Sequence, residues 1–141
     1  MTKKETVLFD LSANDLNASA ETGYEFNLMM PTGDATPVYI TVLGDLSPTV
    51  KNFHRKRYAE MKMQEQAAKR RNKEVDISLE EAEEFAVEAA AVRVKAWRGL
   101  GEGGVEVPCT PENVKRILKA HSWIREQVQS EASEITNFRP K

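Results

Sequence analysis

Three segments of the chain carry residue patterns that begin α-helices, and these starts constrain the fold more than any other feature of the sequence. Ser47 and Thr110 each stand directly before a proline, which places an N-cap hydroxyl ahead of a proline at the first helical position. Ser78 and Glu81 have the spacing of a capping box, in which each side chain satisfies a backbone N–H of the first turn. The chain beyond residue 47 is therefore predicted to be mainly helical.

Two strands are predicted before the first of these helices. Apolar and polar side chains alternate along Tyr24–Met30, and Val38–Leu43 is rich in β-branched and aromatic residues. The turn-forming residues 31–37 join them, which indicates a β-hairpin over residues 23–44. Because a lone hairpin is only marginally stable, its apolar face must be covered. The predicted fold class is α+β, with an N-terminal β-hairpin packed on three to four α-helices.

The length of 141 residues is that of one domain, so residues 1–141 are assigned to a single unit. Residues 1–22 are predicted to be a flexible or short-strand arm, followed by the hairpin at 23–44. The helical part is placed at 47–136, with a Gly-rich turn at 99–104. Turn-forming residues dominate the N-terminal arm, which carries one apolar island, made of Val7, Leu8, Phe9 and Leu11.

The helices differ in how far their apolar faces extend. The first is predicted from Pro48 to about Asn72, and its second half has almost no apolar stripe, so we expect that end to project from the body or to fray. The second is predicted from Ser78 as far as about Arg98, with acidic residues in its first turns and basic residues in its last. Two shorter helices follow, separated at His121.

Charge is distributed in blocks along the chain, although the net charge is only −2. Residues 48–73 hold nine basic and two acidic side chains, a balance of +7, and residues 74–92 hold seven acidic and no basic ones, a balance of −7. Basic side chains of the first block are the candidate partner-binding residues: Arg55, Lys56, Arg57, Lys69, Arg70 and Arg71. Such residues can bind nucleic-acid phosphates or an acidic protein surface, including the acidic helix of the same or another chain. The slightly acidic net charge favours protein over nucleic acid.

No residue pattern points to catalysis, a cofactor or a metal, so the chain is predicted not to be an enzyme. The glycines at 99–104 follow a predicted helix and lack the dinucleotide fingerprint. Cys109 is the only cysteine, which forbids an intramolecular disulfide and fits a reducing compartment. Its place before a helix predicts a lowered pKa, but no base is set beside it, so a packed thiol is the simpler interpretation and its role stays open. No apolar run reaches the length of a membrane span.

Several short motifs resemble those of tail assembly chaperones of long-tailed, siphovirus-like bacteriophages. They are Trp97–Leu100 with the Gly-rich turn after it, Val105–Asn113, Trp123–Val128 and the pair Asn137–Phe138. The earlier order of a Phe-Asp-Leu island, two strands and a basic helix is also similar. Cys109 stands where an aromatic residue is common in such proteins. Both tryptophans, Trp97 and Trp123, are predicted to be core residues with the indole N–H bonded to a carbonyl, and the alternative is that they anchor a partner protein.

The resemblance implies a non-enzymatic protein that binds the tape measure protein and promotes tail tube assembly. It also implies self-association into a homo-oligomer, a location in the host cell cytoplasm and absence from the mature virion. Tail tube subunits would be recruited by a frameshifted longer product. The ending Arg139-Pro140-Lys141 fits this, since it can be encoded as CGC-CCA-AAG, on which tRNAs can slip back by one nucleotide. The alternatives are a structural tail or head component retained in the virion, and a basic-helix nucleic-acid adaptor.

Overall fold

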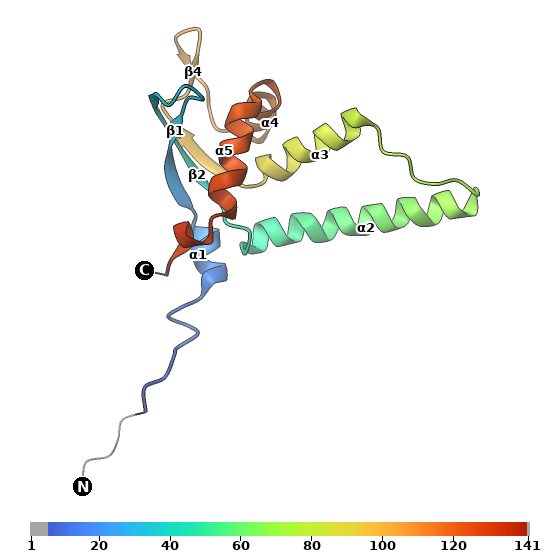
Figure 1. The fold of residues 1–141 in the computed structure, drawn as a ribbon, viewed down its shortest axis with the longest axis horizontal. Helices are drawn as coiled ribbons and strands as arrows, with labels where there is room; N and C mark the ends of the chain where they lie inside the picture. The colour runs from blue at the N-terminus through green and yellow to red at the C-terminus, as the bar shows by residue number, and fades with distance from the viewer. Residues whose placement is uncertain (1–5, 141) are drawn as a thin grey trace.

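The computed structural model describes residues 6–140 and confirms the α+β class (Figure 1). A three-stranded antiparallel sheet, in the order β1-β2-β3, is packed on helices, and a short two-stranded hairpin, β4-β5, stands beside it. The elements are α1 (Leu16–Thr22), β1 (Tyr24–Met29), β2 (Ala35–Val42), α2 (Pro48–Arg70), α3 (Leu79–Ala91), β3 (Val94–Arg98), β4 (Gly101–Glu102), β5 (Val105–Glu106), α4 (Pro111–Ala120), α5 (Ser122–Ser133) and the 3-10 helix η1 (Ile135–Phe138). Residues 1–5 of the expected N-terminal arm, and Lys141 of the expected slippage site, lie outside the described residues.

The predicted hairpin forms between β1 and β2. Phe26 lies opposite Ile40 in the antiparallel register, and the turn is closed by a 2.8 Å hydrogen bond from the Met30 N–H to the Asp34 carbonyl. The covered face of these two strands is buried against α4 and α5, which confirms the predicted packing of the hairpin on helices. The core residues of the hairpin and these helices are Phe26, Leu28, Val38, Ile40, Val42, Val114, Ile117, Leu118, Ile124, Val128 and Ala132.

A third strand corrects the expected course of the second helix. The helix α3 ends at Ala91 instead of near Arg98, and residues 94–98 form β3 along the free edge of β2, with Trp97 opposite Ile40. Val94 and Trp97 are β-branched and aromatic residues, which favour a strand. The edge of β2 also offers backbone groups that a longer helix would leave without partners. The basic residues expected at the end of the helix therefore lie at and within this strand.

Residues 16–22 form the helix α1, whereas residues 1–22 are predicted from the sequence to be a flexible or short-strand arm. Asp15 caps α1, since its carboxylate accepts hydrogen bonds from the backbone N–H groups of Asn17 (3.0 Å) and Ala18 (3.1 Å). An aspartate at the N-cap stabilises the first turn of a helix. The many turn-forming residues around Asp15 favoured an irregular arm and therefore masked this helix start in the sequence. Ala20 on this helix is buried, so α1 is packed on the body. Of the described residues of the predicted arm, only residues 6–15 precede this packed helix.

Glu21 joins α1 to the start of α2. Its carboxylate accepts hydrogen bonds from the Ser47 hydroxyl, from the Thr49 hydroxyl at 2.5 Å and from the Thr49 N–H at 3.3 Å. The hydrogen bond from Ser47, followed by that from Thr49, lowers the pKa of Glu21 below its usual value of 4.5. A charged carboxylate beside a helix N-terminus is also favoured by the helix dipole. This contact fixes the end of α2 from which the rest of that helix extends.

Glu21→Gln is therefore expected to lower the free energy of unfolding by about 1 kcal/mol at pH 7. Because the pKa is lower in the folded than in the unfolded state, the contribution is complete above about pH 4.5 and is lost as the pH falls through the folded pKa. Urea unfolding of both proteins from pH 7 to pH 3 measures this. A difference between the two that stays constant over this range would contradict the assignment.

Candidate partner-binding surfaces

The helix α2 leaves the body as a long arm, and residues 71–78 return from its tip to α3 (Figure 1). Its 23 residues correspond to a length of about 35 Å. Ser47 caps it, accepting a 3.5 Å hydrogen bond from the Val50 N–H, and Pro48 is its first residue, as predicted. Val50 is its only fully buried residue. The expectation that the second half of this helix projects is confirmed.

Aromatic packing holds the base of the arm to α3. The rings of Phe53 and Phe85 are stacked with centroids 6.3 Å apart, and the guanidinium of Arg57 lies 4.8 Å from the centre of the Phe85 ring. Next to them, Arg93 donates a 3.1 Å hydrogen bond to the carboxylate of Asp45 and lies 3.4 Å from Nε2 of His54 on α2. The arm is thus anchored at its base, and beyond the base no residue of α2 is fully buried.

A groove of about 640 Å³ opens between α2 and α3 beyond these rings. Its apolar lining comes from α2, α3 and the segment between them: Met61, Val75, Ile77, Ala82 and Phe85. Met61, Val75 and Ile77 remain 40%, 41% and 52% exposed. Acidic side chains make up most of the polar lining, namely Glu65, Glu81, Glu84 and Glu88. The groove is an apolar surface with acidic edges, which residues 6–140 leave unfilled.

The six candidate basic residues lie at two places on the arm. Arg55, Lys56 and Arg57 are near the base, whereas Lys69, Arg70 and Arg71 are at the tip, about 18–24 Å further along the helix axis. Arg57 is half-buried against Phe85, and the other five are exposed. The structure therefore does not gather them into one cluster. Their predicted role in binding a partner stays a prediction.

The expected pairing of the basic helix with the acidic helix does not occur within the chain. Across residues 6–140, no ion pair joins α2 to α3. The ion pairs of α2 lie within the helix, as between Arg57 and Glu60 at 3.7 Å, and Glu84 of α3 pairs with Lys119 of α4 at 3.5 Å. The physical reason is that aromatic residues occupy the contact face at the base, beyond which the groove separates the two helices.

Two residues of the apolar lining of the groove, Val75 and Ile77, are not predicted from the sequence to be part of a binding surface. Val75 and Ile77 lie in a short segment between two predicted helices, where an apolar residue carries no periodic signal. The one available signal is that two β-branched apolar residues interrupt the most acidic block of the chain.

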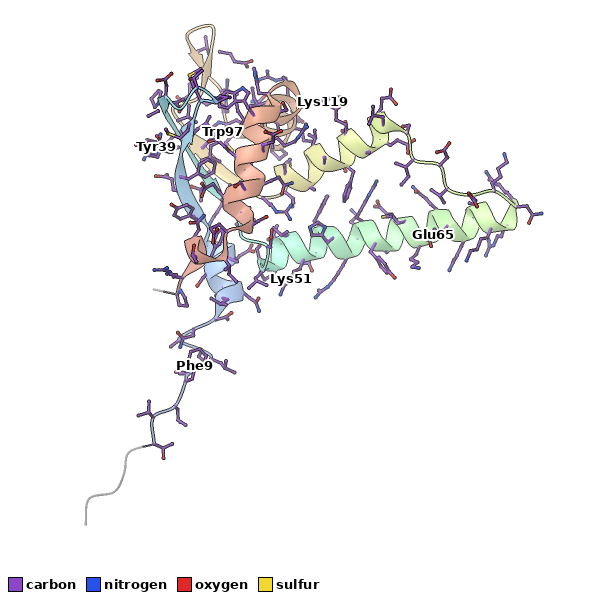
Figure 2. All side chains as sticks on the ribbon, viewed as in Figure 1. Phe9, Tyr39, Lys51, Glu65, Trp97 and Lys119 are labelled. Carbon is purple, nitrogen blue, oxygen red and sulfur yellow. The ribbon has the colours of Figure 1, made fainter. Side chains whose placement is uncertain are left out.

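The N-terminal apolar island forms a second exposed surface. Val7, Leu8, Phe9 and Leu11 are 93%, 78%, 75% and 75% exposed. Figure 1 shows that this part of the chain extends away from the body, and Figure 2 shows Phe9 standing clear of the other elements. We call residues 7–11 the apolar segment. Contiguous exposed apolar side chains of this kind mark sites of interaction.

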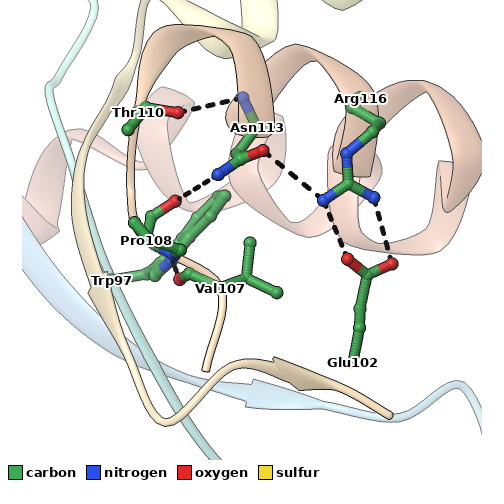
Figure 3. Close-up of polar contacts among 7 residues, drawn as sticks. All are labelled: Trp97, Glu102, Val107, Pro108, Thr110, Asn113 and Arg116. Carbon is green, nitrogen blue, oxygen red and sulfur yellow. Dashed lines mark hydrogen bonds and ion pairs between the residues drawn. The ribbon is translucent and has the colours of Figure 1, made fainter. Parts of the chain in front are cut away.

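The motif between Trp97 and Arg116 has a structural role (Figure 3). The indole N–H of Trp97 donates a 2.8 Å hydrogen bond to the carbonyl of Val107, as predicted for a core tryptophan. Asn113 donates from its side-chain amide to the Pro108 carbonyl at 3.0 Å, and its backbone N–H bonds the Thr110 hydroxyl at 3.2 Å. The Arg116 guanidinium donates two hydrogen bonds, at 2.8 and 3.0 Å, to the Glu102 carboxylate and so joins the β4–β5 hairpin to α4 (Figure 3). Trp123 is partly buried and packs against the core.

Cys109 is half-buried at the start of α4, and the prediction of a lowered pKa is wrong. Burial raises the pKa of the Cys109 thiol, and a backbone hydrogen bond involving Trp97 offsets this only in part. Loss of water around the thiolate, which disfavours its charged form, therefore decides the direction of the pKa shift.

A thiol reagent at pH 8 is accordingly expected to modify Cys109 several-fold more slowly in the folded protein than in the protein unfolded by guanidinium. The rate of release of the coloured product of a disulfide reagent measures both states. Equal rates, or faster modification of the folded protein, would contradict the raised pKa.

No helix within residues 6–140 is both long enough and apolar enough to pass through a membrane. No group of three or more His, Cys, Asp or Glu side chains in the same residues is placed to hold a metal ion.

The fold and these surfaces define a small α+β protein whose distinctive features are an extended arm and exposed apolar side chains. A family model described as "YdaY prophage protein" matches residues 51–141, which is 91 of the 141 residues. The chain therefore belongs to the YdaY prophage protein family, and the phage origin implied by the sequence motifs is confirmed. No curated protein and no solved structure matches it.

Proposed function

We propose that this protein is a tail assembly chaperone of a long-tailed bacteriophage, which binds the tape measure protein and promotes assembly of the tail tube without catalysing a reaction. The observation that carries the proposal is the apolar segment, in which Val7 and Phe9 are 93% and 75% exposed. Membership of a prophage family supports the phage context. The resemblance of Trp97–Leu100 and Val105–Asn113 to such chaperones supports the specific role.

A hydrophobic partner suits the apolar segment. Covering apolar surface contributes roughly 25 cal/mol per Å² removed from water, and four large apolar side chains offer that surface within five residues. The tape measure protein implied by the resemblance is long and hydrophobic, so it exposes matching surface before the tube encloses it. Association with a chaperone would keep that surface from aggregating.

We propose the other partners of the protein and its location in the cell from the same resemblance. The protein would self-associate, act in the host cell cytoplasm, and engage tail tube subunits through a frameshifted longer product. Mass spectrometry of purified particles tests its fate, and absence of the protein from them is the expected result. Its presence in amounts comparable to tail proteins would favour a structural component of the virion.

Co-expression with the tape measure protein of the same prophage tests the role itself. The soluble yield of the tape measure protein is expected to rise when this chain is present. An unrelated soluble protein of similar size serves as the control. A soluble yield that this chain leaves unchanged would overturn the proposal.

A further inference from the structure

We infer that a second copy of this chain docks the outer face of its α2 into the groove between α2 and α3. The inference deepens the self-association named in the proposed function and rests on it. The occupant is identified from the charge of two surfaces that the fold keeps apart within one chain.

The receiving surface is acidic with an apolar floor. Glu81, Glu84 and Glu88 of α3 and Glu65 of α2 line the groove. Two of these carboxylates also have exposed partners at the groove edge, since Glu84 pairs with Lys119 and Glu65 with Lys62, each at 3.5 Å. Arg57 is the only basic residue that lines it, and its charge is already engaged by the Phe85 ring at 4.8 Å and by Glu60 at 3.7 Å. An occupant must therefore bring basic side chains together with some apolar surface.

The outer face of α2 meets this requirement. Lys51, Arg55, Lys62 and Lys69 are separated by four, seven and seven residues, so they share one face of the helix. Tyr58 lies among them with 63% of its surface exposed. Side chains on this face can therefore offer both the basic charges and the apolar contact that the groove lacks.

Most of the outer face lies away from the groove of its own chain, and only Lys62 touches the groove edge, where it pairs with Glu65 at 3.5 Å. The residues of α2 that line the groove include Arg57, Met61 and Gln64, and at 3.6 residues per turn Arg57 lies about 160° around the helix from Arg55. Figure 2 shows Lys51 near the base of the arm and Glu65 further along the same helix. Across residues 6–140 no basic side chain of the outer face pairs with an acidic side chain of α3. Another copy can bring its outer face to the α3 carboxylates Glu81 and Glu88.

Such a contact joins two different surfaces. Two copies that each fill the other's groove close as a two-fold dimer, whereas a one-way contact leaves a groove free for a third copy and extends into a ring or a helical assembly. The expected assembly grows with protein concentration. Salt weakens it, because the screening length falls from about 10 Å at 0.1 M salt to about 3 Å at 1 M salt.

Two charge-reversed variants test the inference by sedimentation velocity. The arm variant carries Arg55→Glu, Lys62→Glu and Lys69→Glu, and the groove variant carries Glu81→Lys, Glu84→Lys and Glu88→Lys. Each alone would bring like charges together, so association at 0.1 M salt is expected to weaken at least about tenfold. In an equimolar mixture, the acidic arm of one variant meets the basic groove of the other, and co-assembly is expected to return.

A matched control reverses three acidic residues away from the arm: Glu106→Lys, Glu112→Lys and Glu126→Lys. This control has the same net charge as the groove variant and is expected to associate like the wild type. Far-UV circular dichroism verifies that each variant is folded. Tyr58→Glu is a second, single-site variant on an exposed position, and it is expected to weaken association without reversing three charges at once.

Several results would overturn the inference. They are a wild-type protein that stays monomeric at all concentrations, folded variants that associate like the wild type, and a mixture of folded variants that does not co-assemble. These results leave the proposed function standing if the tape measure protein is still made soluble by this chain. A tape measure protein that stays insoluble while the charge variants behave as expected would overturn the function and leave the self-association surface.

Discussion

Arg93→Ala is expected to lower the free energy of unfolding by about 3 kcal/mol and to loosen the base of the arm. Arg93 is only 7% exposed. Its guanidinium donates to the Asp45 carboxylate at 3.1 Å and to the Ala89 carbonyl, and lies 3.4 Å from Nε2 of His54. Removing it leaves these groups without their partner at the junction of α2, α3 and the body. The estimate is at the low end for a buried pair, because the Asp45 side chain is 49% exposed.

Arg98→Ala is the matched control for this prediction. Arg98 also pairs with a carboxylate, that of Glu25 at 3.0 Å, but its side chain is 62% exposed. An exposed pair contributes little to stability, because water and salt screen its charges. Urea unfolding of both variants at pH 7 gives the comparison. If Arg93→Ala costs no more than Arg98→Ala, the buried guanidinium does not hold the arm to the body.

Gly99→Ala is expected to lower the free energy of unfolding by about 3 kcal/mol, from the left-handed backbone and from crowding together. Gly99 follows β3 with φ at +80°, and a Cβ atom there would lie 2.4 Å from the carbonyl oxygen of Pro37 in β2. The neighbouring backbone would have to move, which disturbs the pairing of β2 with β3.

Gly103→Ala separates these two causes. Gly103 also has a positive φ, +56°, but a Cβ atom there meets nothing within 4 Å. Its substitution is expected to cost about 1 kcal/mol from the backbone alone. Thermal and urea unfolding of the two alanine variants measure the difference. Equal losses would show that the approach to Pro37 is not a constraint.

Local signals predicted the helix starts of this fold well. Ser47, Ser78 and Thr110 cap α2, α3 and α4 as expected, since each bonds an N–H within its own first turn. The end of α3 was not predictable in this way. Whether residues after Ala91 continue a helix or form a strand depends on the free edge of β2, about fifty residues away in the sequence. Pairing at such separation leaves no local pattern.

The candidate surfaces were predictable only in part. The charge blocks identified the basic residues from Arg55 to Arg71 and the acidic helix beside them. Their relation in space depends on two aromatic rings, Phe53 and Phe85, which join the helices only at the base of the arm. The exposure of the apolar segment likewise depends on what the rest of the fold leaves uncovered, and no periodicity encodes that.

The most direct test of the proposed function is affinity co-purification of the tape measure protein with the tagged chain from cells that express both. One variant replaces Val7, Leu8, Phe9 and Leu11 with serine, and a control replaces four exposed apolar residues elsewhere, namely Met63, Leu79, Val105 and Ile135. The wild type and the control are expected to retain the tape measure protein, and the apolar-segment variant to retain at least about tenfold less. Failure of the wild type to retain it would contradict the chaperone assignment, and full retention by the apolar-segment variant would contradict the binding surface on which it rests.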